Sequence, residues 1–305
     1  MAARCYNTYR MANAGDRFSP AVMTGLLTML TRTTIAHAAA GAAALLPGIA
    51  SAADGAGKPV DAGTALQRPV TPLMEDLVWL DNMLLVIITA ITLLVLALLV
   101  YVIFRFNAKR NPTPARFTHN ALIEVIWTAV PVVILVIIAI PSLRLLDKHV
   151  TIPEPDLTIK AVGNQWYWDY EYPDQGISMS AFMLQRDQLE ENGYEQDEYL
   201  LATDTRVVVP VDANVQLLVT SRDVIHNWAM PSFGIKTDAI PGRVNEAWFR
   251  VTEAGTYFGQ CSELCGKDHA YMPIVVEALP QDEYDAWVEE QVAKANGDTE
   301  VASAD

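Results

Sequence analysis

The chain has 305 residues, 51% of them hydrophobic, and it carries a formal net charge of −15 at pH 7. This acidic balance argues against nucleic acid as a partner, because phosphate binding requires clustered Lys and Arg. A chain of this length allows two or more structural units. Long apolar runs and acidic clusters occupy different parts of the sequence, so we expect a membrane segment joined to a water-exposed domain.

Residues 1–52 have the pattern of a secretory signal. Scattered arginines come first, an Ala-rich apolar run follows, and Ala50-Ser51-Ala52 provides the small residues of a cleavage site. We predict a signal peptide here, with an uncleaved N-terminal extension as the alternative. Cleavage would remove Cys5 and leave two cysteines in the mature chain. Residues 53–78 begin with Gly, Ala and Pro and are predicted to form a flexible lead-in.

The membrane segment is predicted at residues 79–150, as a hairpin of two transmembrane helices. The first apolar run, about 83–104, contains no charged residue and is long enough to cross a bilayer as a helix. The second run, about 121–143, has Glu124 near its start and Pro131 inside it. A buried helix of a soluble protein is the alternative for each run, but two such runs with a short connector favour the membrane.

The connector between the two runs contains basic residues and no acidic ones. The basic residues are Arg105, Lys109, Arg110 and Arg116. The positive-inside rule therefore places the connector in the cytoplasm and both ends of the mature chain in the periplasm. Together with the signal, this predicts a multi-pass protein of the bacterial plasma membrane. Glu124 then lies near the cytoplasmic end of its helix, where an ionisable side chain indicates function by default. The alternative is that Glu124 caps the helix or reaches the lipid headgroups.

The outer domain, residues 151–280, is predicted to be a β-sandwich. Short runs of alternating or β-branched residues are separated by Pro, Gly, Asn and Asp, which is typical of strands joined by turns. The predicted strands are 157–162, 165–172, 206–211, 215–220, 247–251, 256–260 and 273–278. Residues 185–199 form an acidic insertion, most simply a solvated helix or loop. Residues 281–305 are predicted to form a C-terminal helix, from 282 to about 296, and a polar tail.

Acidic residues dominate the outer domain, with 23 Asp and Glu against 8 Lys and Arg between residues 151 and 285. An acidic surface attracts a basic partner and accelerates its association. In the periplasm the obvious basic partner is a c-type cytochrome. Acidity that serves only solubility is the alternative.

The stretch Cys261–Met272 carries the strongest chemical signal in the chain. It holds two thiols, an imidazole and a thioether, which are soft donors that select copper over cations preferring oxygen. The spacing Cys265-x3-His269-x2-Met272 suits a loop folded around one copper ion. Such a site needs a second imidazole, and His226 is the candidate.

Cys261 is surplus to a site with one metal, and its position four residues before Cys265 lets both sulfurs bridge two metals. We therefore favour a binuclear copper centre. A disulfide between the two cysteines is the alternative in an oxidising compartment. Zinc would rarely recruit Met272. A c-type haem needs Cys-x-x-Cys-His, which the sequence lacks.

The run Cys261–Met272, with His226 and Gly163–Trp168 upstream, resembles subunit II of bacterial haem-copper cytochrome c oxidases. The similarity covers roughly residues 79–287. It implies a cupredoxin-like Greek-key β-sandwich with a binuclear copper A centre and a magnesium ion shared with subunit I. The implied copper ligands are His226, Cys261, the backbone carbonyl of Glu263, Cys265, His269 and Met272, and the implied magnesium ligand is the Glu263 side chain.

The resemblance also implies roles for residues that bind no metal. Trp166 is the implied surface residue through which electrons enter, and Trp168, on the same predicted strand, is expected to pack inside. Core packing is the commoner position for any strand tryptophan. Glu124 matches a glutamate at the entrance of the proton path into subunit I. Asn164 stands where the family often has His, and residues 236–243 match a segment expected to face subunit I.

The implied function is that of a cytochrome c oxidase subunit. It accepts electrons from reduced cytochrome c at copper and passes them to haem in subunit I, where O2 is reduced to water with proton translocation. The implied partners are subunits I and III, a basic c-type cytochrome and membrane lipid. A membrane-anchored periplasmic protein that binds or delivers copper is the alternative. A quinol-oxidising relative would typically lack the copper cysteines, and a structural β-domain would hold them as a disulfide.

Overall fold

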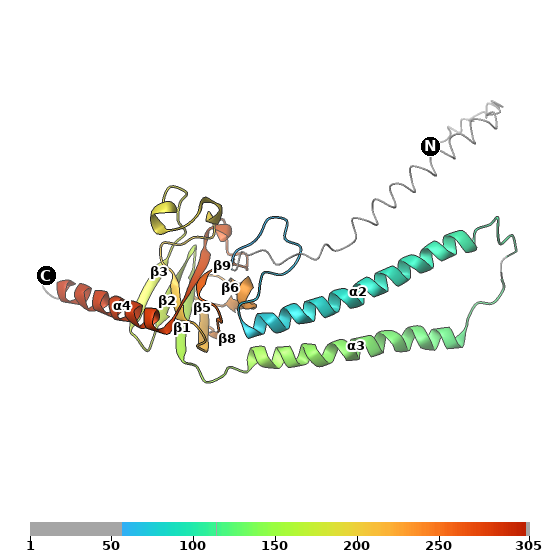
Figure 1. Ribbon diagram of the computed structural model, residues 1–305, viewed down its shortest axis with the longest axis horizontal. Helices are drawn as coiled ribbons and strands as arrows, with labels where there is room; N and C mark the ends of the chain where they lie inside the picture. The colour runs from blue at the N-terminus through green and yellow to red at the C-terminus, as the bar shows by residue number, and fades with distance from the viewer. Residues whose placement is uncertain (1–56, 114, 303–305) are drawn as a thin grey trace, which may run out of the picture. The chain divides into compact units, whose positions relative to one another are not determined.

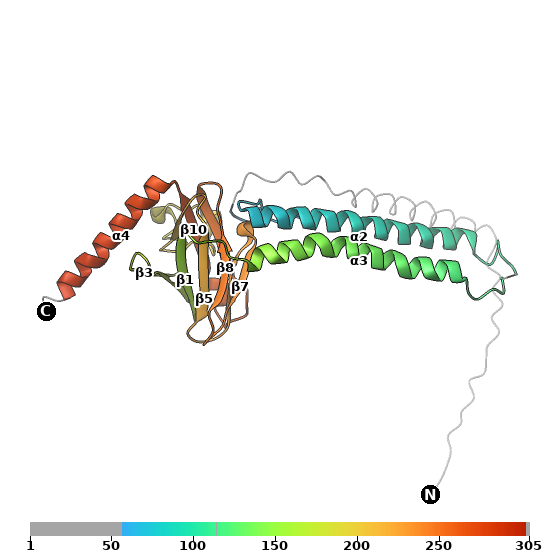
Figure 2. The same cartoon turned by 90° about the horizontal axis from the view of Figure 1, so that it is seen from below.

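The structure is a computed structural model that describes residues 57–113 and 115–302. The predicted signal peptide, residues 1–52, lies outside the described residues. The first two elements are the long helices α2 (Pro72–Arg105) and α3 (Ala121–Val150), which lie side by side in both views (Figures 1 and 2). Both are long and apolar enough to cross a membrane, with mean hydropathy of 3.2 and 2.7. Each extends beyond the apolar run predicted from sequence.

Local residue chemistry explains where the two helices begin. Thr71 accepts a hydrogen bond from the Met74 amide at the start of α2, and Pro72 occupies its first turn, where a missing N–H costs nothing. Asn120 accepts from the Leu122 and Ile123 amides at the start of α3. The apolar side chains of both helices are largely exposed in the described chain. Lipid or other membrane helices must therefore cover them.

The outer domain is a sandwich of two five-stranded sheets, which confirms the predicted architecture. One sheet has the order β3-β2-β1-β5-β8 and the other β4-β10-β9-β6-β7. The strands are β1 (Leu157–Asn164), β2 (Tyr167–Tyr172), β3 (Ile177–Ala181), β4 (Val207–Pro210), β5 (Val215–Ser221), β6 (His226–Met230), β7 (Ile235–Ala239), β8 (Asn245–Phe249), β9 (Gly255–Cys261) and β10 (Pro273–Leu279). The β1–β5 and β4–β10 pairs are parallel, and the other pairs are antiparallel.

The structure differs from the sequence prediction at three strands and one boundary. β3, β6 and β7 were not predicted from sequence. All five residues of β6 are buried, so it lacks the polar–apolar alternation that marks a half-exposed strand. Residues 165–166 form a turn between β1 and β2, so the prediction that Trp166 lies on the same strand as Trp168 is wrong. Trp166 is partly buried and packs against the same core cluster that contains the fully buried Trp168.

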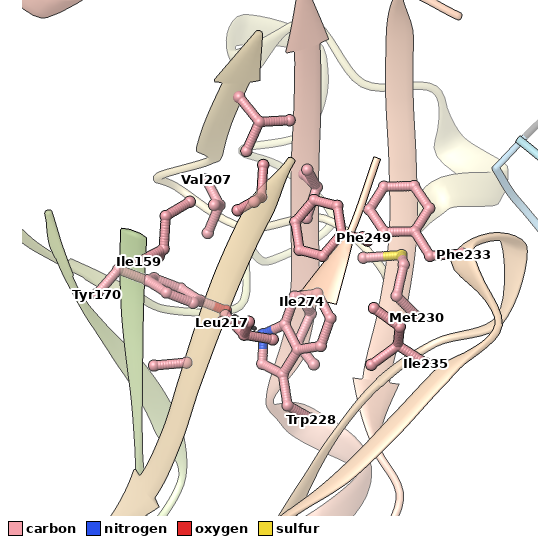
Figure 3. Packing of buried hydrophobic residues seen from close by; sticks show 14 of the residues in the cluster. Ile159, Tyr170, Val207, Leu217, Trp228, Met230, Phe233, Ile235, Phe249 and Ile274 are labelled. Carbon is pink, nitrogen blue, oxygen red and sulfur yellow. Dashed lines mark hydrogen bonds between the residues drawn. The ribbon is translucent and has the colours of Figure 1, made fainter. Parts of the chain in front are cut away.

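Large aromatic side chains fill the space between the two sheets (Figure 3). Trp228 on β6 is fully buried and stacks on Phe249 of β8, with ring centroids 6.2 Å apart. Its Nε1 donates to the hydroxyl of Tyr170 on β2, 3.3 Å away, so this hydrogen bond joins the two sheets. Burial of large apolar side chains supplies most of the folding free energy of such a core. The sheet that carries the candidate metal ligands is therefore packed firmly against the other sheet.

The acidic insertion between β3 and β4 is more than a solvated loop. It contains two short 3₁₀ helices, η1 (Glu190–Asn192) and η2 (Gln196–Glu198). A second apolar cluster joins it to β9 and β10, formed by Leu184, Leu189, Tyr194, Ala202, Phe258 and Val275. Lys58 Nζ also lies 3.1 to 3.3 Å from carboxylates of Glu195, Asp197 and Glu198. The charged side chains face outward while the apolar ones anchor the insertion to the sheet.

The segments at both ends of the outer domain also pack against it. Gly57 accepts a backbone hydrogen bond from Phe258, and Val70 donates one to Ser232, within the stretch predicted to be a flexible lead-in. The C-terminal helix α4 (Gln281–Ala302) is longer than predicted. Trp287 on α4 packs against Tyr172, with ring centroids 5.4 Å apart. These contacts extend the core beyond the sheets themselves.

Candidate metal centre

The donor side chains converge at one end of the sheet that contains β6, β9 and β10. Cys261 ends β9, Cys265 lies in the following loop, and Met272 directly precedes β10. His269 begins the short 3₁₀ helix η4 (His269–Tyr271) inside the same loop. His226 begins β6, which pairs with β9 through Trp228 and Cys261. The strand register therefore brings a histidine 35 residues away in sequence to the thiol of Cys261.

The sulfur and nitrogen atoms form a continuous chain of short contacts. The two Sγ atoms are 3.9 Å apart, and Cys261 Sγ is 4.0 Å from His226 Nδ1. Cys265 Sγ is 3.5 Å from both His269 Nδ1 and Met272 Sδ. Metal–ligand bonds of about 2.0–2.3 Å allow donors of one ion to lie at most roughly 4.5 Å apart. The spacing of these side chains therefore fits metal binding.

The two cysteines are free thiols in the structure. Their sulfur–sulfur separation of 3.9 Å is well beyond a disulfide bond of about 2.05 Å. The backbone carbonyl of Glu263 lies 3.4 Å from Cys261 Sγ, so it faces the cluster, while the Glu263 side chain is exposed. In residues 57–113 and 115–302, His226, Cys261 and Cys265 form the one group of potential metal ligands within 4.8 Å of one another.

Burial and hydrogen bonding give the two thiols different acidities. Burial disfavours the thiolate of Cys261, but hydrogen bonds with His226 and nearby backbone groups outweigh it and lower its pKa to about 7. Burial, followed by the negative charge of Cys261, raises the pKa of Cys265 well above its usual value. Electrostatic repulsion from the first thiolate therefore opposes formation of the second. A bound cation offsets this repulsion, which is the electrostatic match expected of a metal site.

Asp223 orients the buried imidazole of His226. Its Oδ1 lies 2.8 Å from His226 Nε2, and its Oδ2 accepts a hydrogen bond from the Gln165 amide at 2.7 Å. Burial opposes protonation of His226, but hydrogen bonds with Cys261 and Asp223 raise its pKa. A carboxylate on Nε2 leaves Nδ1 directed at the thiol and free to bind metal. Asp223 was not identified from sequence, although its position three residues before His226 was a usable signal.

The ring of His226 also packs closely against β1. A Cβ atom added at Gly163 would lie 2.8 Å from His226 Cδ2. Trp168, on β2, approaches the same ring with centroids 5.9 Å apart. Trp168 is fully buried and its Nε1 donates to the carbonyl of Met272 at 3.4 Å, which confirms that it packs inside. Trp168 therefore contacts two of the predicted ligands, His226 and Met272.

Trp166 also lies against the metal loop, close to Gly266. It is partly buried, and a Cβ at Gly266 would lie 2.9 Å from its Cζ2. The neighbouring Gln165 donates from Nε2 to the Cys265 carbonyl at 2.7 Å. The turn that carries Trp166 is therefore tied directly to a predicted ligand. Asn164 is buried and donates to Asp169, so the departure from His at this position removes no donor from the cluster.

Glu124 is not part of the metal cluster; it lies in the first turn of α3. Its Oε1 accepts a hydrogen bond from the Asn120 amide at 3.2 Å. This contact caps the helix, which was one of the two alternatives for this residue. A groove on α3 is lined by Glu124, Thr128, Ala121, Val125, Ala129, Val132 and Val133. The carboxyl group thus lies at the end of an otherwise apolar surface.

These features define a class: a β-sandwich carried by two membrane-type helices, with buried thiols, imidazoles and a thioether converging at one end. Comparison with known proteins gives the family. Residues 157–279 match "Cytochrome C oxidase subunit II, periplasmic domain", and residues 59–145 match the transmembrane domain of the same subunit. The chain belongs to the cytochrome c oxidase subunit II family, with a cupredoxin-like outer domain, and is a subunit of an oxidoreductase complex.

Two relatives match most of the chain, and one solved structure is similar to about half of it. Cytochrome c oxidase subunit 2 of Cereibacter sphaeroides is 48% identical over 277 residues, covering 85% of this chain and 91% of that protein. Probable cytochrome c oxidase subunit 2 of Rickettsia bellii is 48% identical over 251 residues, with 82% and 92% covered. A crystal structure of the periplasmic domain of subunit II of Bradyrhizobium japonicum cytochrome oxidase is 47% identical, covering 47% of this chain and 99% of that one, with a TM-score of 0.43.

The contact between Asp223 and His226 predicts that Asp223→Asn weakens metal binding. Loss of an outer-sphere partner typically lowers metal affinity by about 10- to 100-fold. Copper affinity should be measured by competition with a chelator on the full chain in detergent. Asp187→Asn is the control, because it removes the same charge from an exposed position in the insertion. Equal affinities for the two variants would contradict an orienting role for Asp223.

Proposed function

We propose that this subunit receives electrons from reduced cytochrome c at a binuclear copper A centre and passes them to haem in subunit I. In that partner O2 is reduced to water with proton translocation. The observation that carries the proposal is the chain of donors in contact with one another, with two free, buried thiols 3.9 Å apart at its centre. Its ligands are His226, Cys261, the Glu263 carbonyl, Cys265, His269 and Met272.

The arrangement of donors supports two metals in place of one. Each thiol has its own imidazole, because Cys261 contacts His226 and Cys265 contacts His269. The thioether of Met272 lies on the Cys265 side and the Glu263 carbonyl on the Cys261 side. Each of the two sulfur atoms therefore has two further donors of its own. Copper in such a site supplies a one-electron redox couple.

The surrounding residues hold the donors in place before and after an electron arrives. His226 and Met272 are almost fully buried, and both contact the buried Trp168. Side chains packed on all sides cannot easily change position when the charge of the site changes. Buried ligands also disfavour the alternative function of copper delivery, because a carrier needs ligands that exchange. We therefore assign the cluster to electron transfer.

Trp166 is the proposed point at which electrons enter. It lies against Gly266, and its neighbour Gln165 is bonded to the Cys265 carbonyl. The path from the indole to the sulfur pair is therefore short and made of directly contacting groups. The acidic outer domain supports docking of a basic c-type cytochrome beside this residue, because opposite charge accelerates association.

The remaining partners follow from the membrane segment and the loop. We assign the chain to the bacterial plasma membrane with its copper domain in the periplasm, after removal of residues 1–52 as a signal. Subunits I and III would cover the exposed apolar surfaces of α2 and α3. The exposed Glu263 side chain is the proposed magnesium ligand at the border with subunit I, since carboxylate oxygen suits that ion.

The proposal predicts two copper ions per chain and one unpaired electron shared between them in the oxidised state. Copper should be quantified on the full chain purified in mild detergent, followed by visible absorption and electron spin resonance. A single copper, a zinc ion or a signal from isolated copper would contradict the binuclear site. Cys261→Ser should abolish the shared-electron signal, because it removes one of the two sulfurs.

Trp166→Phe should sharply lower the rate at which reduced cytochrome c passes electrons to the assembled oxidase. The phenyl ring leaves space where the indole contacts Gly266 and so weakens the path to the loop. Oxidation of a small artificial reductant that reaches copper directly should survive. Tyr167→Phe is the control, since Tyr167 is the adjacent aromatic and packs on Phe182 instead. Unchanged electron transfer in Trp166→Phe would remove the proposed route.

Glu124→Ala should slow turnover of the assembled oxidase while the copper content stays normal. Glu124→Gln separates the two roles of the residue, because an amide oxygen can still accept from the Asn120 amide but cannot carry a proton. Slow turnover in both variants indicates proton transfer, whereas recovery in Glu124→Gln indicates capping alone. Glu75→Ala, in the first turn of α2, is the control.

A further inference from the structure

A lysine lies over the tryptophan at which electrons are proposed to enter. Lys267 Nζ is 5.0 Å from the centroid of the Trp166 ring, within the range of a cation–π contact. The lysine side chain is 76% exposed, so its charge faces solvent at the same place. The contact joins the metal loop to the β1–β2 turn, and Lys267 directly follows Gly266, which itself abuts the indole.

The remaining surface of Trp166 is mostly covered by protein. The indole packs against the domain core, and Gly266 closes on its Cζ2 edge. Gln165, the residue before it, is anchored to the Cys265 carbonyl and to Asp223. The indole is therefore only partly accessible, and the Lys267 ammonium group lies over its ring. A docking partner must approach this charge before it contacts the ring.

This positive charge is opposite in sign to the net charge of the domain. Lys267 is one of 8 basic residues against 23 acidic ones between residues 151 and 285. It pairs with Asp268, whose Oδ2 lies 2.7 Å from Nζ, but its side chain stays 76% exposed. The acidic domain attracts a basic protein from a distance, but at the point of contact it meets a cation.

We infer that Lys267 determines which cytochromes reduce this oxidase. By its position over Trp166, it penalises a donor with dense positive charge around its haem edge and favours one with fewer positive charges there. The inference rests on the proposed function, since it assumes that electrons enter at Trp166. Placing like charges together is a recognised way to reject a wrong partner.

The test compares the rates at which cytochromes reduce the assembled oxidase carrying Lys267→Gln or the control Lys294→Gln. Lys267→Gln should raise the second-order rate of reduction by a strongly basic c-type cytochrome by about two- to fivefold at low ionic strength, the effect of one charge in water. The increase should disappear at high salt, where exposed charges are screened. With an acidic c-type cytochrome, the same variant should lower the rate.

Lys294→Gln is the matched control for the change in net charge. Lys294 is also exposed, and it pairs with Glu290 at 2.7 Å, but it lies on α4. Its substitution should move the rates much less than Lys267→Gln does. Lys267→Arg, which retains the charge, should restore the wild-type preference. Equal rates in Lys267→Gln and Lys294→Gln, or a slower reaction of Lys267→Gln with the basic donor, would overturn the inference.

Each rate should be divided by the rate with a small neutral reductant, so that any change at copper itself cancels. If Lys267→Gln loses copper, Lys267→Met provides the same comparison with an uncharged chain of similar length. Trp166→Phe should be measured alongside. If Trp166→Phe is slow while Lys267→Gln and Lys294→Gln react at equal rates, only the proposed role of Lys267 is contradicted. If Trp166→Phe is unaffected, the proposed route fails instead.

Discussion

Two buried thiols whose sulfur atoms lie 3.9 Å apart cannot both ionise cheaply unless a cation lies beside them. The protein favours one thiolate, at Cys261, through its contact with His226, and disfavours the second by burial and by the charge of the first. Metal binding removes that conflict. The arrangement is therefore poorly suited to a structural role and well suited to metal binding, with an imidazole on each sulfur.

The β-sandwich makes this cluster possible by supplying donors from two separate strands. Pairing of β6 with β9 brings His226 to Cys261, while the β9–β10 loop folds its own donors inward. Close packing against Gly163 and the bond to Asp223 then define the orientation of the imidazole. The same carboxylate holds the Gln165 amide, so one side chain positions both a ligand and the turn that carries Trp166.

Charge is distributed unevenly over the outer domain. Its acidic insertion is attached by apolar residues, and Lys58 binds three of its carboxylates. Near Trp166, by contrast, Lys267 places a positive charge over the indole. Long-range attraction depends on net charge, whereas selection depends on the charges that touch. The proposed docking of a basic donor therefore depends on both the net charge of the domain and the Lys267 charge at the contact.

The sequence by itself predicted the two membrane-type helices and the set of candidate metal ligands. Bilayer thickness requires long uninterrupted apolar runs, and four of the five candidate side-chain donors lie within one short loop, so both signals are local. Only the tertiary structure placed Trp166 in a turn instead of a strand, joined Asp223 to His226, and set Lys267 over the indole. It also showed β6, whose complete burial erases the alternation that reveals a strand. These features depend on strand register, which brings together residues such as Gln165 and Cys265 that local sequence patterns cannot relate.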